Sequence, residues 1–290
     1  MCLVAFALDK SRKYPLVVAA NRDEYFERPT ARLAWWMPAD GGPAILGGRD
    51  LESGGTWLGL TAQGRLGLLT NLRDSSRTFD EAPSRGHIVP NWLSAREPVD
   101  KFWMRTAVSG YNGFNLIAAD FRSGECLWVS NSGAYPRRLE RGVYGLSNAA
   151  LDTPWPKVIA LKERMISGVE SAASVDDLAA HLFKALSDRT VADDSRLPKT
   201  GVPHERERQL SPAFIRLPDH SYGTRTSTVV ITERVNRHQI THVFERTFSA
   251  IDGVALMRRS TIKRWPPRHT SAAAAPCVEH AAVAETESQT

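Results

Sequence analysis

Short apolar runs separated by polar turns dominate the first 150 positions and predict strands. Cys2–Leu8 and Leu16–Asn21 flank a polar turn that ends in proline, which indicates an antiparallel pair. Three more pairs and one single strand follow the same pattern: Thr56–Thr61 with Arg65–Asn71, Phe114–Ala119 with Cys126–Ser130, Thr226–Thr232 with Gln239–Phe248, and Val143–Leu146 alone. Antiparallel sheet is therefore expected in both halves of the chain.

A period near 3.6 residues replaces this pattern in the middle of the chain and predicts helices. The apolar positions of Trp155–Val169 recur on one face, and Pro156 is tolerated because it lies in the first turn. Ser174, followed three residues later by Asp177, resembles an N-cap signal. A second helix is therefore expected to begin there and to end near Leu186.

The remaining segments are assigned by composition. Weaker helical patterns cover His87–Ala95 and Val99–Val108, and Asp188–Pro218, rich in Asp, Arg and Pro, is expected to be a loop. Residues 263–290 contain paired prolines and an alanine run and cannot bury a core, so we expect a disordered basic, alanine-rich tail. Residues 1–262 then form one α+β domain with stacked sheets.

Composition narrows the class of protein. The chain has 290 residues, 42% of them hydrophobic and 24% charged, which excludes a coiled coil, a collagen and a wholly disordered protein. It contains no apolar run long enough for a membrane span. The net charge of +5 is scattered and forms no nucleic-acid-binding motif, so no nucleic-acid partner is expected. Cys2, Cys126 and Cys277 are widely spaced, which favours free thiols and a cytoplasmic location.

A cysteine at position 2 suggests a specific chemistry. A small second side chain favours removal of the initiator Met, which would leave Cys2 with both a thiol and a free α-amine. The ordinary pKa of an α-amine is about 7.7 to 8.0 and that of a thiol is about 8.5, so one residue would supply nucleophile and base. The alternative is that Cys2 is a small hydrophobic residue that opens a buried strand.

The polar cluster Asn21-Arg22-Asp23-Glu24 follows the second predicted strand directly. If the first two strands form a hairpin, its end lies beside the start of the first strand, which brings Asn21 and Asp23 near Cys2. A carboxylate at that place can hold the α-ammonium group, and Arg22 can balance its charge or bind an anionic substrate. The alternative is an ordinary solvated turn.

Seven segments together resemble a known family. They are Met1-Cys2, Ala19-Ala20-Asn21-Arg22-Asp23-Glu24, Gly54-Gly55-Thr56-Trp57-Leu58-Gly59, Leu69-Thr70-Asn71, Tyr111-Asn112-Gly113-Phe114-Asn115-Leu116, Tyr144-Gly145-Leu146-Ser147-Asn148 and Tyr222-Gly223-Thr224-Arg225-Thr226. In this order they resemble the NRDE family, also called the Transport and Golgi organization protein 2 family, from residue 1 to about 250. The resemblance implies a four-layer αββα N-terminal nucleophile hydrolase fold, with two antiparallel sheets between helices, related to penicillin V acylases and bile salt hydrolases.

The resemblance also implies roles for individual residues. By similarity to those amidases, Cys2 is the nucleophile and Asp23 holds its α-amine. Asn148 and Asn71 are the expected amide donors to the oxyanion, although each, taken alone, is also an ordinary residue for ending a strand. Arg225 is expected to stabilise the region of the catalytic thiol.

Residues around the predicted nucleophile are assigned to substrate binding. Asn21, Arg22 and Trp57 are the candidates, although Gly54–Trp57 is also typical of a tight turn before a strand. One position departs from the amidases, which carry an Arg where this chain has Ala20. Either Arg22 takes over from a position that strand alternation would point to the other face, or that function is absent.

The resulting hypothesis is a cysteine hydrolase that cleaves a linear amide bond through a thioester on Cys2. The alternative is a non-catalytic member of the family that acts in Golgi organisation or carries haem or a lipid-like ligand. A small-molecule substrate or ligand is expected, with no cofactor. His238 and His242 are the one histidine pair with close spacing, and no metal site is expected. The oligomeric state does not follow from the sequence.

Overall fold

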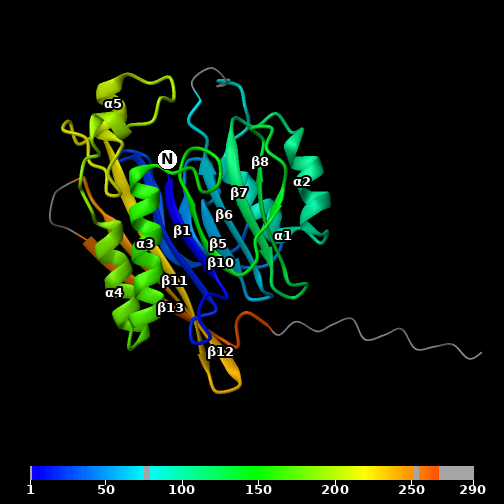
Figure 1. Ribbon diagram of the computed structural model, residues 1–290. Coiled ribbons are helices and arrows are strands. Elements are labelled where there is room, and N and C mark those ends of the chain that lie inside the picture. Colours follow the sequence, from blue (N-terminus) through cyan, green and yellow to red (C-terminus); the bar gives the residue numbers. More distant parts are fainter. Residues whose placement is uncertain (1, 75–78, 251–254, 268–290) are drawn as a thin grey trace, which may run out of the picture.

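Two antiparallel sheets lie face to face in the computed structural model, which describes residues 2–74, 79–250 and 255–267 (Figure 1). Sheet A contains, in spatial order, β10 (Gly142–Leu146), β1 (Cys2–Leu8), β2 (Leu16–Tyr25), β11 (Tyr222–Val235), β12 (His238–Phe248) and β13 (Ala255–Lys263). Sheet B contains β3 (Thr30–Trp36), β4 (Ile45–Asp50), β5 (Leu58–Thr61), β6 (Arg65–Asn71), β7 (Phe114–Asp120), β8 (Glu125–Ser130) and β9 (Arg137–Arg138).

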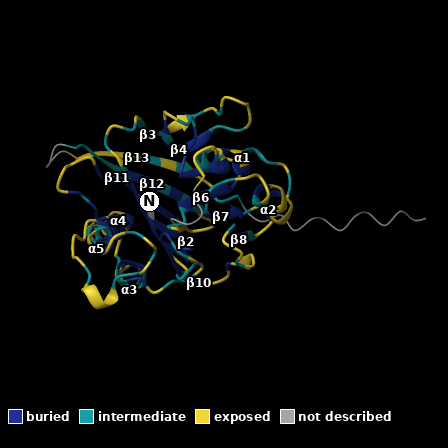
Figure 2. Cartoon of the chain, turned by 90° about the horizontal axis from the view of Figure 1, so that it is seen from above, coloured by how far each residue is buried: buried dark blue, intermediate teal, exposed yellow. Residues whose placement is uncertain are grey.

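Helices cover the outer face of each sheet. The helices α3 (Pro156–Ser171) and α4 (Val175–Leu186) pack on sheet A, and α1 (Ile88–Ser94) and α2 (Val99–Ala107) pack on sheet B. Viewed from above, the two helical layers flank the buried strands (Figure 2). The predicted four-layer αββα arrangement of two antiparallel sheets between helices is therefore confirmed.

The strands β1 and β2 of sheet A are buried on both faces, which explains their continuous apolar runs. In β1, Leu3 and Ala5 belong to the core under α3 and α4, whereas Val4 and Phe6 belong to the core between the sheets. Helix α3 approaches the sheet closely because β10 carries a glycine: a Cβ at Gly145 would lie 2.5 Å from a methyl carbon of Val158. Strand β1 is therefore packed between sheet B on one face and the helices α3 and α4 on the other.

The predicted local elements are largely confirmed. The helices predicted at Trp155–Val169, His87–Ala95 and Val99–Val108 correspond to α3, α1 and α2, and the Ser174 hydroxyl accepts a hydrogen bond from the Asp177 amide at the start of α4 (3.1 Å). The predicted strand pairs are also present as β1–β2, β5–β6, β7–β8 and β11–β12.

Several elements differ from the sequence-based expectation. Strands β3, β4, β9 and β13 were not predicted; β3 is irregularly paired and β4 carries two glycines, which weakens their patterns. The segment Asp188–Pro218, expected to be a loop, contains the 3₁₀ turn η3 (Asp194–Arg196) and the short helix α5 (His204–Gln209). A further 3₁₀ turn, η2 (Arg85–His87), precedes α1.

The disordered tail was predicted to begin at residue 263, which is too early in the sequence. Trp265 is completely buried, and its indole Nε1 donates a hydrogen bond to the carbonyl oxygen of Thr61 (2.8 Å). Its ring contacts that of Phe121, with the centroids 5.4 Å apart. Residues 263–267 therefore belong to the packed domain, because this tryptophan fills the space between the sheets. Residues 268–290 lie outside the described part of the chain.

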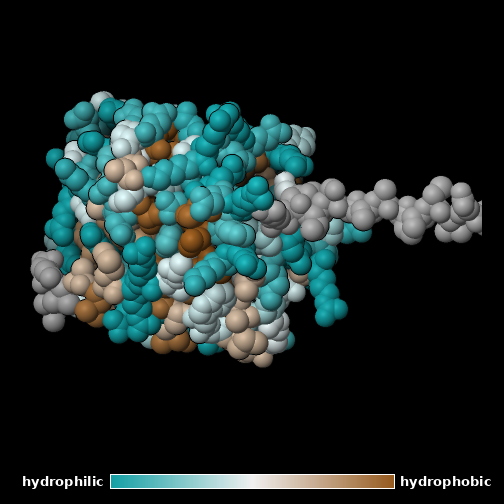
Figure 3. Space-filling view, turned by 90° about the horizontal axis from the view of Figure 1, so that it is seen from below, coloured by the Kyte–Doolittle hydropathy of each residue, from teal (hydrophilic) through white to brown (hydrophobic). Residues whose placement is uncertain are grey.

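In the described ranges, no helix has both the length and the apolar character that a membrane span requires. Figure 3 shows the end of the molecule that lies away from the start of β1. Hydrophilic side chains cover most of that face, and the hydrophobic patches between them are separated.

The Trp265 side chain is expected to contribute strongly to stability. Trp265→Ala removes a fully buried ring and its hydrogen bond, and should lower the free energy of unfolding by about 3–5 kcal/mol in urea titrations. Trp35, which is 43% exposed, is the matched control, and Trp35→Ala should cost less than about 1 kcal/mol. Equal losses in the two variants would contradict the placement of Trp265 in the core.

Glu245 in β12 is a buried carboxyl group between the sheets. It is 1% exposed, and its Oε1 accepts hydrogen bonds from the Leu33 amide (2.6 Å) and the Thr247 hydroxyl (3.4 Å). Its Oε2 has no hydrogen-bond partner in the described ranges. Burial raises the pKa of Glu245 to about 7, although the Leu33 amide and the charges of Arg258 and Arg32 oppose the shift.

This carboxyl group should make stability depend on pH. A carboxyl whose pKa is higher in the folded state stabilises the protein at low pH, and this contribution is lost as pH rises from about 4.5 to about 7. The loss should be roughly 3 kcal/mol in the free energy of unfolding. Glu245→Gln should abolish this part of the pH dependence, whereas the exposed Glu140→Gln should preserve it. An unchanged pH profile in Glu245→Gln would refute the assignment.

Candidate active site

One end of the two sheets collects most of the predicted site residues. The register places Cys2 of β1 opposite Arg22 of β2, and Asp23 opposite Thr224 of β11. Asn71 ends β6, and Asn148 follows β10 at the same end. Figure 1 shows the start of β1 at the top of the molecule, between α5 and the strands of sheet B.

The cluster Asn21–Glu24 lies inside β2, not after it as the sequence suggested, because β2 continues to Tyr25. Strand alternation therefore divides the cluster between two faces. Asn21 and Asp23 face the layer of α3 and α4, whereas Arg22 faces sheet B. Ala20 also lies in the core between the sheets, so Arg22 shares its face, contrary to the expectation that it would point to the other side.

Asp23 is 1% exposed and firmly held. Its Oδ1 accepts a hydrogen bond from the Thr224 hydroxyl (2.7 Å), and its carbonyl oxygen accepts one from the Tyr222 hydroxyl (3.1 Å). Burial raises the pKa of Asp23, while the positive charges of Lys157 and Arg73 and the bond from Thr224 oppose that shift. The carboxylate is therefore oriented by its neighbours and surrounded by buried positive charge.

Arg73, one of the positive charges near Asp23, is paired with a carboxylate from another element. Arg73, which follows β6, forms an ion pair with Glu207 of α5 (2.5 Å) and lies over the ring of Trp155 (5.1 Å to the centroid). Glu207 also accepts hydrogen bonds from the Thr200 amide and hydroxyl. These contacts anchor α5 against the end of sheet B beside the candidate site.

Asn71 and Asn148 lie next to each other. The side-chain Nδ2 of Asn148 donates a hydrogen bond to the carbonyl oxygen of Asn71 (2.8 Å), and the Arg73 amide donates to the carbonyl oxygen of Asn148 (2.8 Å). Asn148 is 1% exposed, and Asn71 is half-buried at the wall of a cleft. The two predicted amide donors thus come from different sheets, and the side chain of Asn148 joins them by its hydrogen bond to the backbone of Asn71.

The side chain of Asn21 makes hydrogen bonds that connect elements of the fold. Its Nδ2 donates to the carbonyl oxygens of Leu186 and Ala213 (2.8 Å each), and its Oδ1 accepts from the Ser227 hydroxyl (2.6 Å). The side chain therefore joins β2 to the end of α4 and does not line the cleft, where it was predicted to bind substrate.

Arg22 and Trp57 do line the cleft, where Arg22 belongs to a buried ion network. Its Nη2 contacts the Oδ2 of Asp50 (2.8 Å), which also accepts a hydrogen bond from the Nε of Arg28 (2.7 Å). The Arg22 guanidinium lies over the ring of Trp57, 4.5 Å from its centroid. Although burial acts to raise it, the pKa of Asp50 is lowered by the bonds from Arg28 and the Ser53 amide and by the charge of Arg22.

Arg225 lies at a bulge, where the pairing of β11 with β2 shifts between Thr224 and Thr226. Its Nη1 donates hydrogen bonds to three carbonyl oxygens in the turn after β2, and its guanidinium lies over the ring of Phe26 (5.2 Å to the centroid). Burial lowers the pKa of Arg225, and the charge of Arg22 adds to that effect. Arg225 thus holds the turn that carries Arg28.

A cleft of about 510 Å³ opens at this end of the sheets, a size that suits a small organic molecule. It is lined by Arg22–Tyr25 of β2, by Leu69 and Asn71 of β6, by Thr56 and Trp57, by residues 82–86 and by Arg206 and Tyr222. Its walls therefore combine aromatic and apolar surface with several arginines and carboxylates.

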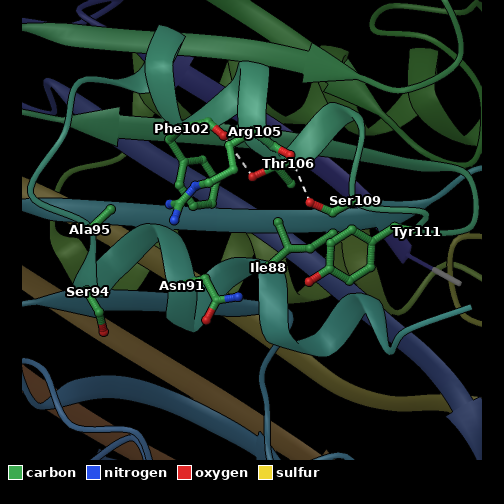
Figure 4. A pocket seen from close by; sticks show the side chains of 9 residues that line it. All are labelled: Ile88, Asn91, Ser94, Ala95, Phe102, Arg105, Thr106, Ser109 and Tyr111. Atoms are coloured by element: carbon green, nitrogen blue, oxygen red, sulfur yellow. Dashed lines mark hydrogen bonds between the residues drawn. The ribbon is translucent and has the colours of Figure 1, made fainter.

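Another cavity, of about 380 Å³, lies between α1 and α2 (Figure 4). Two of its hydroxyl groups are engaged within the chain around α2: Thr106 donates to the carbonyl oxygen of Phe102 and Ser109 to that of Arg105 (2.8 Å each). The predicted site residues do not line it. We therefore locate the candidate site in the cleft at the end of the sheets, which several of the predicted residues line.

Several residues around the cleft were missed by sequence analysis. Thr224 and Tyr222 lie in one of the segments that carry the family resemblance, which is a signal that could have identified them. Asp50, Arg73 and Glu207 lie outside those segments, and their roles depend on contacts between distant parts of the chain. In the described ranges, no cluster of three or more His, Cys, Asp or Glu side chains is arranged to hold a metal ion.

Comparisons with known proteins agree with the resemblance. The family model described as Transport and Golgi organisation 2 matches residues 1–250. The chain is 34% identical over 255 residues to the Transport and Golgi organization protein 2 homolog of Bos taurus, covering 80% of this chain and 89% of that protein. It is 32% identical over 255 residues to the Homo sapiens homolog, with the same coverage, and 29% identical over 273 residues to the Drosophila melanogaster protein, covering 87% and 94%.

A solved structure is also similar. It is that of a Caenorhabditis elegans ortholog of N-acylethanolamine-hydrolyzing acid amidase, with a TM-score of 0.45 and 11% sequence identity. The similarity covers 79% of this chain and 92% of that chain.

The ion network on the cleft wall should be essential to stability. Asp50→Asn leaves Arg22 and Arg28 without their shared carboxylate, and should lower the free energy of unfolding at pH 7 by about 3–5 kcal/mol. Glu52, whose side chain is 58% exposed, also pairs with Arg28, and Glu52→Gln should cost less than about 1 kcal/mol.

Because the pKa of Asp50 is lowered, the stabilisation that its carboxylate gives the native protein should disappear only as pH falls below the ordinary value of 3.8. Denaturant titrations measure both effects, and equal losses in the two variants would contradict the network.

Proposed function

The chain belongs to the Transport and Golgi organisation 2 family, and we propose that it is a cysteine N-terminal nucleophile hydrolase that cleaves a linear amide bond. The observation that carries this proposal is the strand register. It brings Cys2 opposite Arg22 and beside the buried Asp23, at the end of the sheets where Asn71 and Asn148 meet and a cleft opens.

The proposed reaction begins after removal of Met1. The α-amine of Cys2 accepts the proton of the thiol, and the sulfur attacks the carbonyl carbon of the amide. The resulting oxyanion accepts hydrogen bonds from the amide groups of Asn148 and Asn71. Asp23 orients the α-ammonium group, which then donates its proton to the leaving nitrogen.

Breakage of the carbon–nitrogen bond releases the amine and leaves a thioester on Cys2. The α-amine next removes a proton from a water molecule, whose oxygen attacks the thioester carbonyl. The tetrahedral intermediate collapses, the carbon–sulfur bond breaks, and the sulfur regains the proton held by the α-ammonium group. The acid is released, and the reaction needs no cofactor.

A second candidate function is that of a carrier that keeps the fold without hydrolysis and holds a lipid-like ligand or haem in the cleft. Ala20 supports it, because the related amidases carry an arginine at this position and here a small side chain lies in the core between the sheets. A carrier would bind its ligand with Cys2 replaced. For haem, a Soret band that persists in Cys2→Ala would support this function.

The hydrolase proposal is tested first at the N-terminus. Intact-protein mass spectrometry should show loss of Met1, and an electrophilic acyl probe should label the native protein but not Cys2→Ala. Cys126 is an internal control: burial raises its pKa to about 12, so little thiolate forms at neutral pH. The probe experiment uses a Cys277→Ser background, because Cys277 lies outside the described residues. Retention of Met1, or labelling that persists in Cys2→Ala, would contradict the mechanism.

Turnover is tested next against a library of acyl amides. Cys2→Ala should lose activity completely, and Asn148→Ala should lower kcat by about 100- to 1,000-fold through the lost oxyanion contact. Circular dichroism would confirm that both variants are folded. Glu140→Gln, at an exposed position that is not part of the cleft lining, is the control that should keep native activity.

A further inference from the structure

Arg206 of α5 differs from Arg22 and Arg28, which line the same cleft, in how its charge is balanced. Arg22 and Arg28 share Asp50, and each also contacts Glu24. In the described part of the chain, by contrast, no carboxylate forms an ion pair with Arg206, although the side chain is half-buried and lines the cleft. The pKa of the exposed Asp219 is lowered mainly by hydrogen bonds from Ser221 and also by the charge of Arg206, but the two side chains form no ion pair.

The carboxylates nearest to Arg206 in sequence are already engaged. Glu207 pairs with Arg73 and accepts two hydrogen bonds from Thr200. Glu205 accepts a hydrogen bond from Gln209, on the exposed side of α5. The guanidinium of Arg206 is therefore available to pair with an anionic group of a molecule in the cleft.

The guanidinium of Arg206 has a fixed support. It lies over the ring of Tyr222, 5.6 Å from the centroid, and that ring packs edge-on against Tyr25 (5.1 Å between centroids). The Tyr222 hydroxyl donates to the carbonyl oxygen of Asp23. Contact with a ring face leaves the N–H groups at the edge of a guanidinium available for a planar anion, which arginine binds through two parallel hydrogen bonds.

Other parts of the cleft wall are apolar. Trp57, Leu69, Ala82 and Pro83 line it together with the arginines. A molecule that fits this surface has an apolar portion and one negative group. At about 510 Å³ the cleft has room for both.

From this arrangement we infer that the substrate is an acyl amide with an apolar chain and a carboxylate, and that Arg206 is the residue that recognises the carboxylate. This inference rests on the proposed hydrolase function for the identity of the bond that is cleaved. Recognition of the carboxylate itself depends only on the cleft, so that it can be measured without turnover.

The test compares two probes of matched shape on the Cys2→Ala protein, which cannot form a thioester. N-decanoylglycine carries a carboxylate, and N-decanoylglycinamide carries a neutral amide in its place. Isothermal titration should show that the carboxylate probe binds about 10-fold more tightly, because a charge-assisted bidentate pair adds to the same apolar contact. The ratio of the two affinities should fall as salt is added.

Variants at Arg206 identify the residue responsible. Arg206→Gln should reduce the ratio of the two affinities to about 1, whereas Arg206→Lys should keep part of it, because the charge remains without the planar fork. Arg208→Gln, on the exposed side of the same helix, is the matched control and should keep the full ratio. Circular dichroism checks that each variant is folded, and if Arg206→Gln is not, Arg206→Lys and the salt titration decide.

Equal binding of the two probes to Cys2→Ala, or an unchanged ratio in Arg206→Gln, would overturn the carboxylate inference. The proposed function fails by a different result: the native protein hydrolyses neither probe nor any amide of the library. A carboxylate preference that depends on Arg206 would still stand in that case as the property of a binding cleft.

Discussion

The register between β1 and β2 is the constraint on which the candidate site depends. It aligns Cys2 with Arg22, and the alternation of a strand then sends Asp23 to one face of the sheet and Arg22 to the other. A slip of one residue would exchange the two faces and place the aspartate among the apolar side chains between the sheets. Because β1 and β2 are buried on both faces, their apolar residues oppose such a slip.

Buried charge reinforces this register. Asp50 joins Arg22 and Arg28 on one side of the cleft, and Arg73 joins Glu207 on the other, so each ion pair connects segments that are distant in sequence. Breaking a buried pair leaves an uncompensated charge, which is costly. Such pairs therefore favour one arrangement of the cleft walls, even where their net contribution to stability is small.

Sequence patterns could predict the elements that depend on local interactions. The period of α3, the cap at Ser174 and the short hairpins are encoded within a few residues, and the family resemblance supplied the four-layer arrangement. The end of β2 could not be read in this way, because a buried polar run has the composition of a turn. The burial of Trp265 and the pairing of Arg73 with Glu207 depend on partners far along the chain, which no local pattern reveals.

The order of strands in sheet A has a consequence for synthesis. β2 pairs with β11, so that Tyr25 meets Tyr222, and the nascent chain must grow by about 200 residues before this pairing forms. At roughly 5–20 residues per second, the ribosome needs at least about 10 seconds for that interval. Until then the β2 edge of the first hairpin remains unpaired and apolar, which promotes aggregation, and we expect chaperones to protect it. The candidate site is therefore completed late, and chains truncated before Tyr222 would carry Cys2 without the β11 residues that surround the candidate site.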